Sequence, residues 1–414
     1  MLAKVSVGTK DLQRYRLELG NELIDEIEKL AYELKDVRMC HINSTPFGGG
    51  VAELLSSYIP LVRSLGLTVD WQVMRGDRAF FEITKCIHNA LQGDNCGILA
   101  HEKSRRRYMA QNEVNARELD YDYDVFIVND PQPAALRHFI KDTHNKWIWR
   151  CHIDTSGPDD FTWNFLRSYI EQYDAAIFTM SQFVPQDLVI PRTGIMAPAI
   201  DAYNSKNMLL PRGLCREMAS NLGIDRERPL ILQVSRFDPW KDPFGVIEIF
   251  RLAREQIPGL QLALVGSLAC DDPEGLDIFA EVNNIASQDD DMFVFTNLTG
   301  VGSMEVNAFQ TACNVVIQKS IKEGFGLVVS EALWKGTPVV GGNAGGIPMQ
   351  MTGNLSNYLA SSVEDFVEKV VYLLENKEIA DQLGKEGREN VIRNFLMPRL
   401  IRDELALVKA VVES

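Results

Sequence analysis

The sequence has 414 residues, of which 46% are hydrophobic and 24% are charged, as in an ordinary globular protein. A chain of this length is too long for a single hydrophobic core, so we expect two or three domains. The formal net charge of −15 argues against a nucleic acid or an anionic membrane as the main partner.

Apolar, strand-like runs alternate with helical patterns along the chain. In the first half these runs are 36–43, 67–74, 123–130, 146–153 and 175–180. In the second half they are 229–237, 260–266, 292–298, 313–320 and 337–342. Such alternation predicts βαβ units and largely parallel sheets, whose strands are buried on both faces.

The alternation is interrupted at 201–228, and a fresh strand begins at Pro229. We therefore expect an α/β protein with two doubly wound, Rossmann-like domains that face each other across a cleft. Ligands of such sheets bind beyond the carboxyl ends of the strands. The predicted parts are a first domain at 1–205, a junction at 206–228, a second domain at 229–394, and a tail helix at 395–414 that packs back on the first domain.

Three glycines, Gly48, Gly49 and Gly50, lie between the first strand and a helical pattern. They could form a tight turn, or a concave run of N–H groups that binds an anion at the start of the helix. The segment is not a GxGxxG fingerprint, because Glu53 occupies the place of the third glycine, and no GKS or GKT follows.

Arg236 and Lys241 follow the first strand of the second half, on a loop stiffened by Pro239 and Pro243. Most lysines and arginines are solvated surface residues. Two fixed cations at the carboxyl end of a sheet could instead bind a diphosphate, and we favour this interpretation. Arginine can bind oxygen atoms in a bidentate way, and lysine acts as a point charge.

Two carboxylates, Glu323 and Glu331, flank the segment "GFGLVVS". They could complement a helix dipole, or they could accept hydrogen bonds from sugar hydroxyls. His152 and Asp154 follow another strand, and His152 is either an interior histidine or a hydroxyl-binding group. Two acidic runs with DxD spacing, 120–124 and 289–291, precede strands, so we expect solvated loops there and no metal site.

Several segments together resemble the retaining, GT-B fold nucleotide-sugar glycosyltransferases, and within them the trehalose glycosyltransferring synthases (trehalose synthases). The resemblance extends over nearly the whole chain. One departure is Asp242, where many relatives have glycine. The segments that carry the resemblance are "GGGVAELL", "HNALQG", "NDPQPAAL", "WRCHID", "QVSRFDPWKDPFGVIEIF" and "EGFGLVVSEALWKGTPVVGGNAGGI".

The resemblance implies reversible transfer of glucose from a nucleoside diphosphate glucose to glucose, giving α,α-trehalose. It implies an acceptor-side first domain and a donor-binding second domain. The implied catalytic residues are His152, Glu323, Arg236 and Lys241. The implied acceptor-binding residues are Gly50 and Asp154. The implied donor-binding residues are Gly48, Gly49, Gly50, Arg236, Lys241, Gly324, Phe325, Gly326, Leu327, Val328 and Glu331, the last holding the ribose.

Fixed cations and helix-end N–H groups would stabilise the leaving diphosphate. No carboxylate stands out as a nucleophile of the kind that retaining glycosidases use, so we favour same-face attack. No tightly bound cofactor or metal site is expected, although Mg²⁺ could stimulate the reaction. The alternatives are a related transferase with a sugar phosphate or glycerate as acceptor, and an inactive sugar- or nucleotide-binding regulatory protein.

The remaining features concern the cellular setting. The amino terminus is polar and no apolar run is long enough for a bilayer, so we expect a cytoplasmic protein without a signal peptide. A homodimer is left open.

We expect reduced thiols and no disulfide framework, because the seven cysteines are scattered and odd in number. They are Cys40, Cys86, Cys96, Cys151, Cys215, Cys270 and Cys313.

Overall fold

The computed structural model describes residues 1–94, 96–141, 144–268 and 273–414. These residues form two compact units, the first made of 1–199 with 397–414 and the second of 200–396. Residues 206–228, which we expected to be a junction, belong to the second unit. They contain α7 (Arg212–Ser220), which packs on α10 (Ser303–Ala312).

The first unit is built on a seven-stranded sheet with the order β1-β3-β2-β4-β5-β6-β7. All neighbouring strands are parallel except β1, which runs antiparallel to β3. The strands are β1 (Ala3–Lys4), β2 (Arg38–Asn43), β3 (Thr68–Val73), β4 (Val125–Asn129), β5 (Lys146–Cys151), β6 (Ala175–Phe178) and β7 (Thr193–Ile195).

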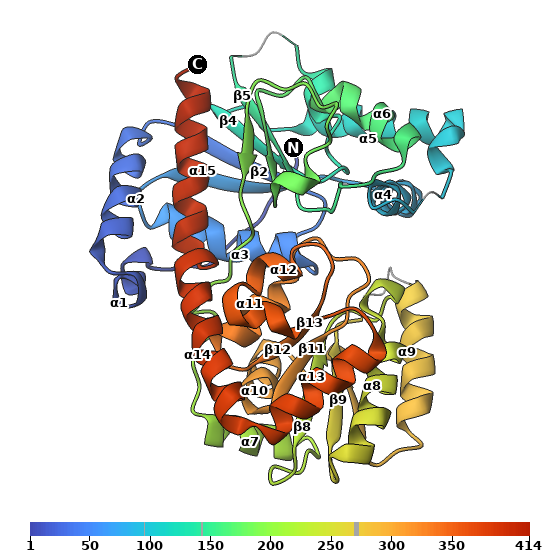
Figure 1. Ribbon diagram of the computed structural model, residues 1–414. Coiled ribbons are helices and arrows are strands. Elements are labelled where there is room, and N and C mark those ends of the chain that lie inside the picture. The colour runs from blue at the N-terminus through green and yellow to red at the C-terminus, as the bar shows by residue number, and fades with distance from the viewer. Residues whose placement is uncertain (95, 142–143, 269–272) are drawn as a thin grey trace. The chain divides into compact units, whose positions relative to one another are not determined.

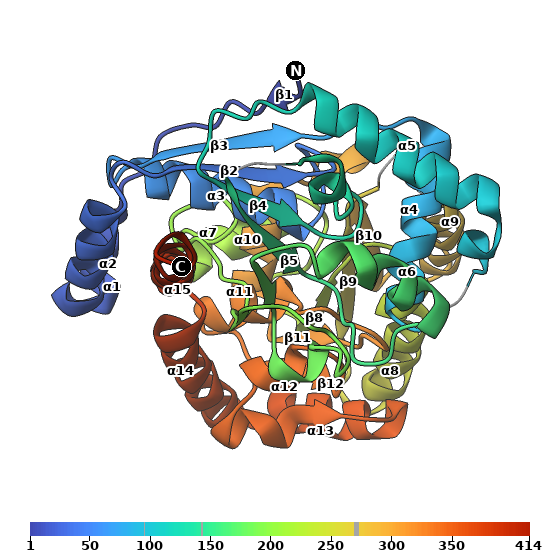
Figure 2. The ribbon, with the colours of Figure 1, turned by 90° about the horizontal axis from the view of Figure 1, so that it is seen from above.

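The central strands β2, β4 and β5 are almost wholly buried, because helices cover both faces of this sheet. The tail helix α15 (Met397–Val412) packs against α2 and α3, as Figures 1 and 2 show. The other helices are α1 (Arg16–Leu19), α2 (Asn21–Glu33), α3 (Gly50–Arg63), α4 (Arg78–Leu91), α5 (Glu102–Glu118) and α6 (Asp160–Ile170).

The second unit contains a six-stranded, wholly parallel sheet with the order β10-β9-β8-β11-β12-β13. Its strands are β8 (Leu230–Val234), β9 (Gln261–Gly266), β10 (Met292–Thr296), β11 (Val315–Gln318), β12 (Val339–Gly342) and β13 (Leu359–Ala360). Besides α7 and α10, its helices are α8 (Pro243–Gln256), α9 (Pro273–Ala286), α11 (Leu327–Trp334), α12 (Ile347–Gln350), α13 (Val363–Glu375) and α14 (Lys377–Asn394).

Every predicted strand is present, and the expected α/β fold with two parallel sheets is confirmed. The structure adds β1, β7 and β13, which have only two or three residues each. Residues 363–394 form two helices that meet at Asn376. The tail helix was expected to begin at residue 395. It begins at Met397, since the preceding helix, α14, extends to Asn394.

The expectation of reduced thiols is wrong for one pair, because Cys86 of α4 forms a disulfide with Cys96. Their Cα atoms lie 5.9 Å apart, within the usual range for a disulfide, and their spacing in the sequence resembles no motif. Four other cysteines are free and buried, namely Cys40, Cys151, Cys215 and Cys313, and Cys270 lies outside the described residues. Among the described residues, no helix is both long and apolar enough to span a bilayer.

Candidate functional site

The glycine loop of the first unit joins the end of β2 to the start of α3. Gly48 and Gly49 have φ angles of 70° and 79°, a left-handed conformation that glycine adopts without steric cost. A Cβ atom at either position would meet open space, so backbone conformation and not crowding requires glycine here. No side chain caps Gly49, and the loop is exposed. The first turn of α3 therefore offers N–H groups to an anion or a hydroxyl.

Three polar residues meet at the carboxyl ends of β4 and β5. The Nε2 atom of His152 lies 2.9 Å from Oδ1 of Asn129, and the backbone N–H of His152 donates to Oδ1 of Asp130 at 2.9 Å. Asp130 has a φ of 66°, which is uncommon for a residue other than glycine. Burial raises the pKa of Asp130 to about 7. Burial also lowers the pKa of His152 well below its usual value, and Arg150 lowers it further.

A buried charge cluster belongs to the same unit. Glu404 of α15 accepts a hydrogen bond from Nη1 of Arg150 at 2.5 Å, and its other oxygen lies 3.2 Å from Nε2 of His41. Burial alone would raise the pKa of Glu404, but His41, Arg150 and Tyr58 outweigh it, and the resulting pKa is about 2. The tail helix is thus tied by a buried carboxylate to two strands of the sheet.

In the second unit, the loop after β8 meets the turn after β11. The backbone N–H of Ile321 donates to the carbonyl of Trp240 at 2.7 Å, which joins the two segments. As a result, Nζ of Lys241 lies 2.7 Å from Oε2 of Glu323, and both side chains are mostly buried. Gln318 and Ser320 also donate to this carboxylate oxygen. The structure therefore brings together Lys241 and Glu323, two candidate residues that the sequence analysis had considered separately.

Arg236 extends from the same loop into solvent, with 60% of its side chain exposed and an ion pair to Asp238 at 3.3 Å. Asp238 also caps the short 3₁₀ turn Pro239–Lys241, because it accepts from the N–H of Lys241. This capping bond fixes the backbone from which the Lys241 side chain projects.

Asp242 has a backbone conformation that is uncommon for a residue other than glycine. Its φ is 45°, in the left-handed region that glycine adopts without steric cost. Here its carboxylate caps α8 by accepting from the N–H of Gly245, and it pairs with Lys319. A Cβ at Gly245 would lie 2.4 Å from this carboxylate, so a larger residue there would force the side chains of Asp242 and Lys319 to move.

The turn from Glu323 to Gly326 is held by close backbone packing. A Cβ on Gly345 would lie 1.5 Å from the carbonyl oxygen of Glu323, and one on Gly346 would lie 2.8 Å from Cα of Phe325. Gly326 has a φ of 81°, and no side chain caps α11 at this residue. The start of α11, with half-buried Gly324, Leu327 and Val328, therefore leaves N–H groups without a side-chain cap next to the Lys241–Glu323 pair.

Glu331 lies about one turn inside α11, which begins at Leu327. Its side chain is fully buried in α11, 2.8 Å from Nζ of Lys206, and Gln310 donates to it at 3.1 Å. Burial opposes ionisation, but Lys206 and Lys335 outweigh it, so the pKa of Glu331 is lowered. In this structure the Glu331 carboxylate is therefore paired with groups of the protein itself.

Asp154 is half-buried and accepts from the N–H of Ser156 at 2.9 Å, which forms a turn after β5. The two acidic runs precede β4 and β10, as expected. Their carboxylates pair with basic residues, for example Asp122 with Arg38 and Asp291 with Arg228.

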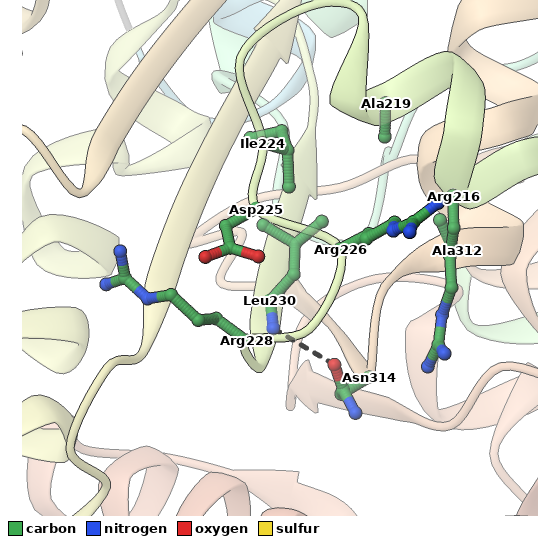
Figure 3. A pocket seen from close by; sticks show the side chains of 9 residues that line it. All are labelled: Arg216, Ala219, Ile224, Asp225, Arg226, Arg228, Leu230, Ala312 and Asn314. Carbon is green, nitrogen blue, oxygen red and sulfur yellow. Dashed lines mark hydrogen bonds between the residues drawn. The ribbon is translucent and has the colours of Figure 1, made fainter.

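A small pocket of about 10 Å³ lies at the amino end of β8, beside Leu230 and Asn314. Figure 3 shows that, of its three arginines, Arg228 extends to the opposite side from Arg216 and Arg226. The N–H of Leu230 donates to Oδ1 of Asn314 at 3.0 Å. The pocket lies at the other end of the strands from Lys241 and Glu323. Its charged side chains do not all point toward one place.

Sequence reasoning missed Asn129, Asp130, Lys206 and Lys319. Asn129 and Asp130 stand directly at the end of a predicted strand, so the rule that singled out His152 would have found them. Lys206 and Lys319 have no such local signal, because their partners are distant in the sequence.

Comparison with known proteins gives consistent matches. The family "Trehalose synthase, N-terminal domain" matches residues 41–185, and "Glycosyl transferases group 1" matches 216–390. The trehalose synthase of Rubrobacter xylanophilus is 46% identical over 98% of both chains.

Solved structures share the fold at low identity. Sucrose-phosphate synthase from Thermosynechococcus elongatus has a TM-score of 0.70 at 17% identity, covering 91% of this chain and 99% of that one. Anabaena Alr3699/HepE, solved with UDP and glucose, has a TM-score of 0.65 at 13% identity, covering 90% and 99%. With its GT-B fold and the near full-length match to a trehalose synthase, the chain belongs to the trehalose synthase family of glycosyltransferases.

Proposed function

We propose that the protein transfers glucose from a nucleoside diphosphate glucose to glucose, forming α,α-trehalose with retention at the donor carbon. The observation that carries this proposal is the Lys241–Glu323 pair beside the uncapped start of α11. A cation, a carboxylate and helix-end N–H groups together suit a sugar diphosphate. Membership of the family supports the trehalose product.

In this proposal the second unit binds the donor. Breaking the bond between the anomeric carbon and the phosphate oxygen places negative charge on the leaving diphosphate. Lys241, Arg236 and the first N–H groups of α11 stabilise that charge, because they are in place before the reaction begins. Glu323 accepts hydrogen bonds from hydroxyls of the transferred glucose, while its contact with Lys241 keeps both side chains oriented.

The first unit contributes groups that suit hydroxyls. His152 contacts the transferred hexose, Asp154 accepts from the acceptor sugar, and the Gly48–Gly50 loop offers N–H groups. These groups can form hydrogen bonds without adding a full positive charge next to the reacting carbon, where positive charge develops during transfer.

Retention of configuration at the donor carbon determines which bonds form and break. The acceptor hydroxyl forms a bond to the anomeric carbon on the face that the diphosphate leaves, and the hydroxyl proton passes to the leaving phosphate oxygen. This same-face route requires no nucleophilic carboxylate of the kind that retaining glycosidases use.

The test is product analysis by NMR after incubation with UDP-, ADP- and GDP-glucose, each with glucose, a sugar phosphate or glycerate as acceptor. The proposal predicts α,α-trehalose from at least one donor. Transfer only to a sugar phosphate or glycerate would show a related transferase with another acceptor. Nucleotide binding without transfer to any of these acceptors would contradict the enzyme proposal and favour a binding protein.

A further inference from the structure

Asn129, at the carboxyl end of β4, is buried with 1% of its surface exposed. Its Nδ2 atom donates to the carbonyl of Ile42 at 3.1 Å and to that of Ile127 at 3.3 Å. Its Oδ1 atom lies 2.9 Å from Nε2 of His152. Neighbouring backbone carbonyls therefore fix which way the amide points.

This orientation determines where the imidazole carries its proton. The NH₂ group of an amide only donates hydrogen bonds, and its oxygen only accepts them. Because two carbonyls occupy the NH₂ group, the oxygen faces His152, and Nε2 must be the donor. In a neutral ring the other nitrogen, Nδ1, is then an acceptor. Among the residues that the structure describes, no hydrogen bond involves Nδ1, and the residue is half-buried.

The surroundings of His152 keep the ring neutral. Burial lowers its pKa first, and Arg150 of β5 and His41 of β2 lower it further, whereas Glu404 of α15 raises it. Asp130 faces the residue as well, but its Oδ1 accepts from the backbone N–H of His152, which fixes the main chain.

We propose that Asn129 is a positioning residue that fixes His152 as the Nε2–H tautomer, so that His152 accepts a hydrogen bond at Nδ1 from a substrate hydroxyl. The hydroxyl contact rests on the proposed function, whereas the tautomer does not. A neutral acceptor also avoids placing a cation near the anomeric carbon, which becomes positive during transfer.

The tautomer is measured directly by ¹⁵N NMR of histidine-labelled full-length protein, with the His152 signals identified by their loss in His152→Gln. The expected spectrum has a protonated Nε2 and an unprotonated Nδ1 at neutral pH. A protonated Nδ1 in the wild type, in the neutral or the cationic ring, overturns the proposal. This measurement needs no folded variant of Asn129 and no activity.

Two variants of Asn129 then test its role. Asn129→Leu removes the acceptor, so His152 should populate both tautomers, and kcat/KM should fall about tenfold, as for the loss of one hydrogen bond in a buried site. Asn129→Asp keeps an acceptor and stabilises the cationic ring. Its activity should therefore be lost, as pH falls, at a higher pH than in the wild type. Unchanged His152 spectra in both variants would overturn the role of Asn129.

Asn115→Leu is the matched control. Asn115 is equally buried in the same unit, but it bonds to Arg75 and Gln111. The Asn115→Leu variant should leave the His152 spectrum and the pH profile of activity unchanged. An equal spectral change in this control would mean that any buried cavity disturbs His152, and would contradict the proposal. Absence of transfer by the wild type would reject the proposed function alone, because the spectra still decide the tautomer.

Discussion

The two units carry different kinds of side chain at the carboxyl ends of their strands. In the first unit, Asn129 and His152 are neutral hydrogen-bonding groups, and the charges of Arg150 and Glu404 are buried in a separate cluster. In the second unit, Lys241 and Glu323 pair at the strand ends themselves. This difference supports the proposal that the second unit binds the charged part of a donor and the first unit binds hydroxyl groups.

The starts of the helices also differ in whether a side chain caps them. The glycine loop leaves the start of α3 without a side-chain cap. By contrast, Asp242 caps α8 with its own carboxylate. An anion that approaches the second unit should therefore meet α11, which begins at uncapped Gly326, and not α8.

The largest effect should come from the buried charges of the first unit. Glu404→Gln leaves Arg150 without its counter-charge, and we expect the free energy of unfolding at pH 7 to fall by roughly 3–5 kcal/mol. The folded pKa of about 2 lies below the ordinary value of 4.5, so this stabilisation is present above about pH 4.5 and is lost as pH falls towards 2.

Urea unfolding between pH 2 and 7 measures this effect. The difference between wild type and Glu404→Gln should shrink as the pH falls. Glu413→Gln, just after the same helix, is the control, because its carboxylate is 65% exposed. A difference that stays constant across the range would show that the charge of Glu404 is not responsible.

The next effect concerns the Lys241–Glu323 pair. Lys241→Met keeps most of the side-chain volume but removes the charge, and we expect kcat/KM to fall by roughly 10- to 150-fold, as for one charge-assisted contact of about 1.5–3 kcal/mol. Arg251→Met, on the exposed part of α8, should leave the kinetics unchanged. Steady-state assays on folded protein decide this, and wild-type kinetics for Lys241→Met would place the diphosphate elsewhere.

A smaller effect is expected at the glycine loop. Gly49→Ala adds a Cβ at a φ of 79°, where the left-handed conformation costs roughly 1–2 kcal/mol, so the loop should shift and kcat/KM should drop about tenfold. Gly8→Ala is a control in the same unit, since Gly8 has no such φ and open space for a Cβ. If both variants behave alike in kinetics and thermal unfolding, the loop conformation is not needed.

The smallest effect should come from Asp242. Asp242→Gly loses the cap and the pair with Lys319 but relieves the left-handed backbone, so the free energy of unfolding should change by less than about 1 kcal/mol. Asp242→Ala loses the same contacts without that relief and should be less stable than Asp242→Gly by about 1 kcal/mol. Equal stability of the two variants in denaturant titrations would mean that the backbone at this residue is not strained.

The sequence predicted the strands well because each is an apolar run bounded by polar residues. It missed β1, β7 and β13, since two or three residues are too few to form a pattern. The rule that ligands bind at carboxyl ends also located Gly48–Gly50, His152, Lys241 and Glu323.

Other features of the site could not be predicted from a local pattern in the sequence. The buried Glu331 pairs with Lys206, which the chain brings from a distant segment. Asn129 has no charge and belongs to no spacing motif, so its effect on His152 is visible only when the directions of its hydrogen bonds are known.

The most direct test of the account is calorimetric titration of UDP, ADP and GDP into wild type, Lys241→Met and Glu323→Gln. If the second unit holds the diphosphate, the nucleotide that binds wild type should bind Lys241→Met at least about tenfold more weakly. Glu323→Gln should bind it at least as tightly as wild type, because the lysine loses a competing carboxylate. Equal Kd values for all three proteins, or equal weakening in both variants, would contradict the account.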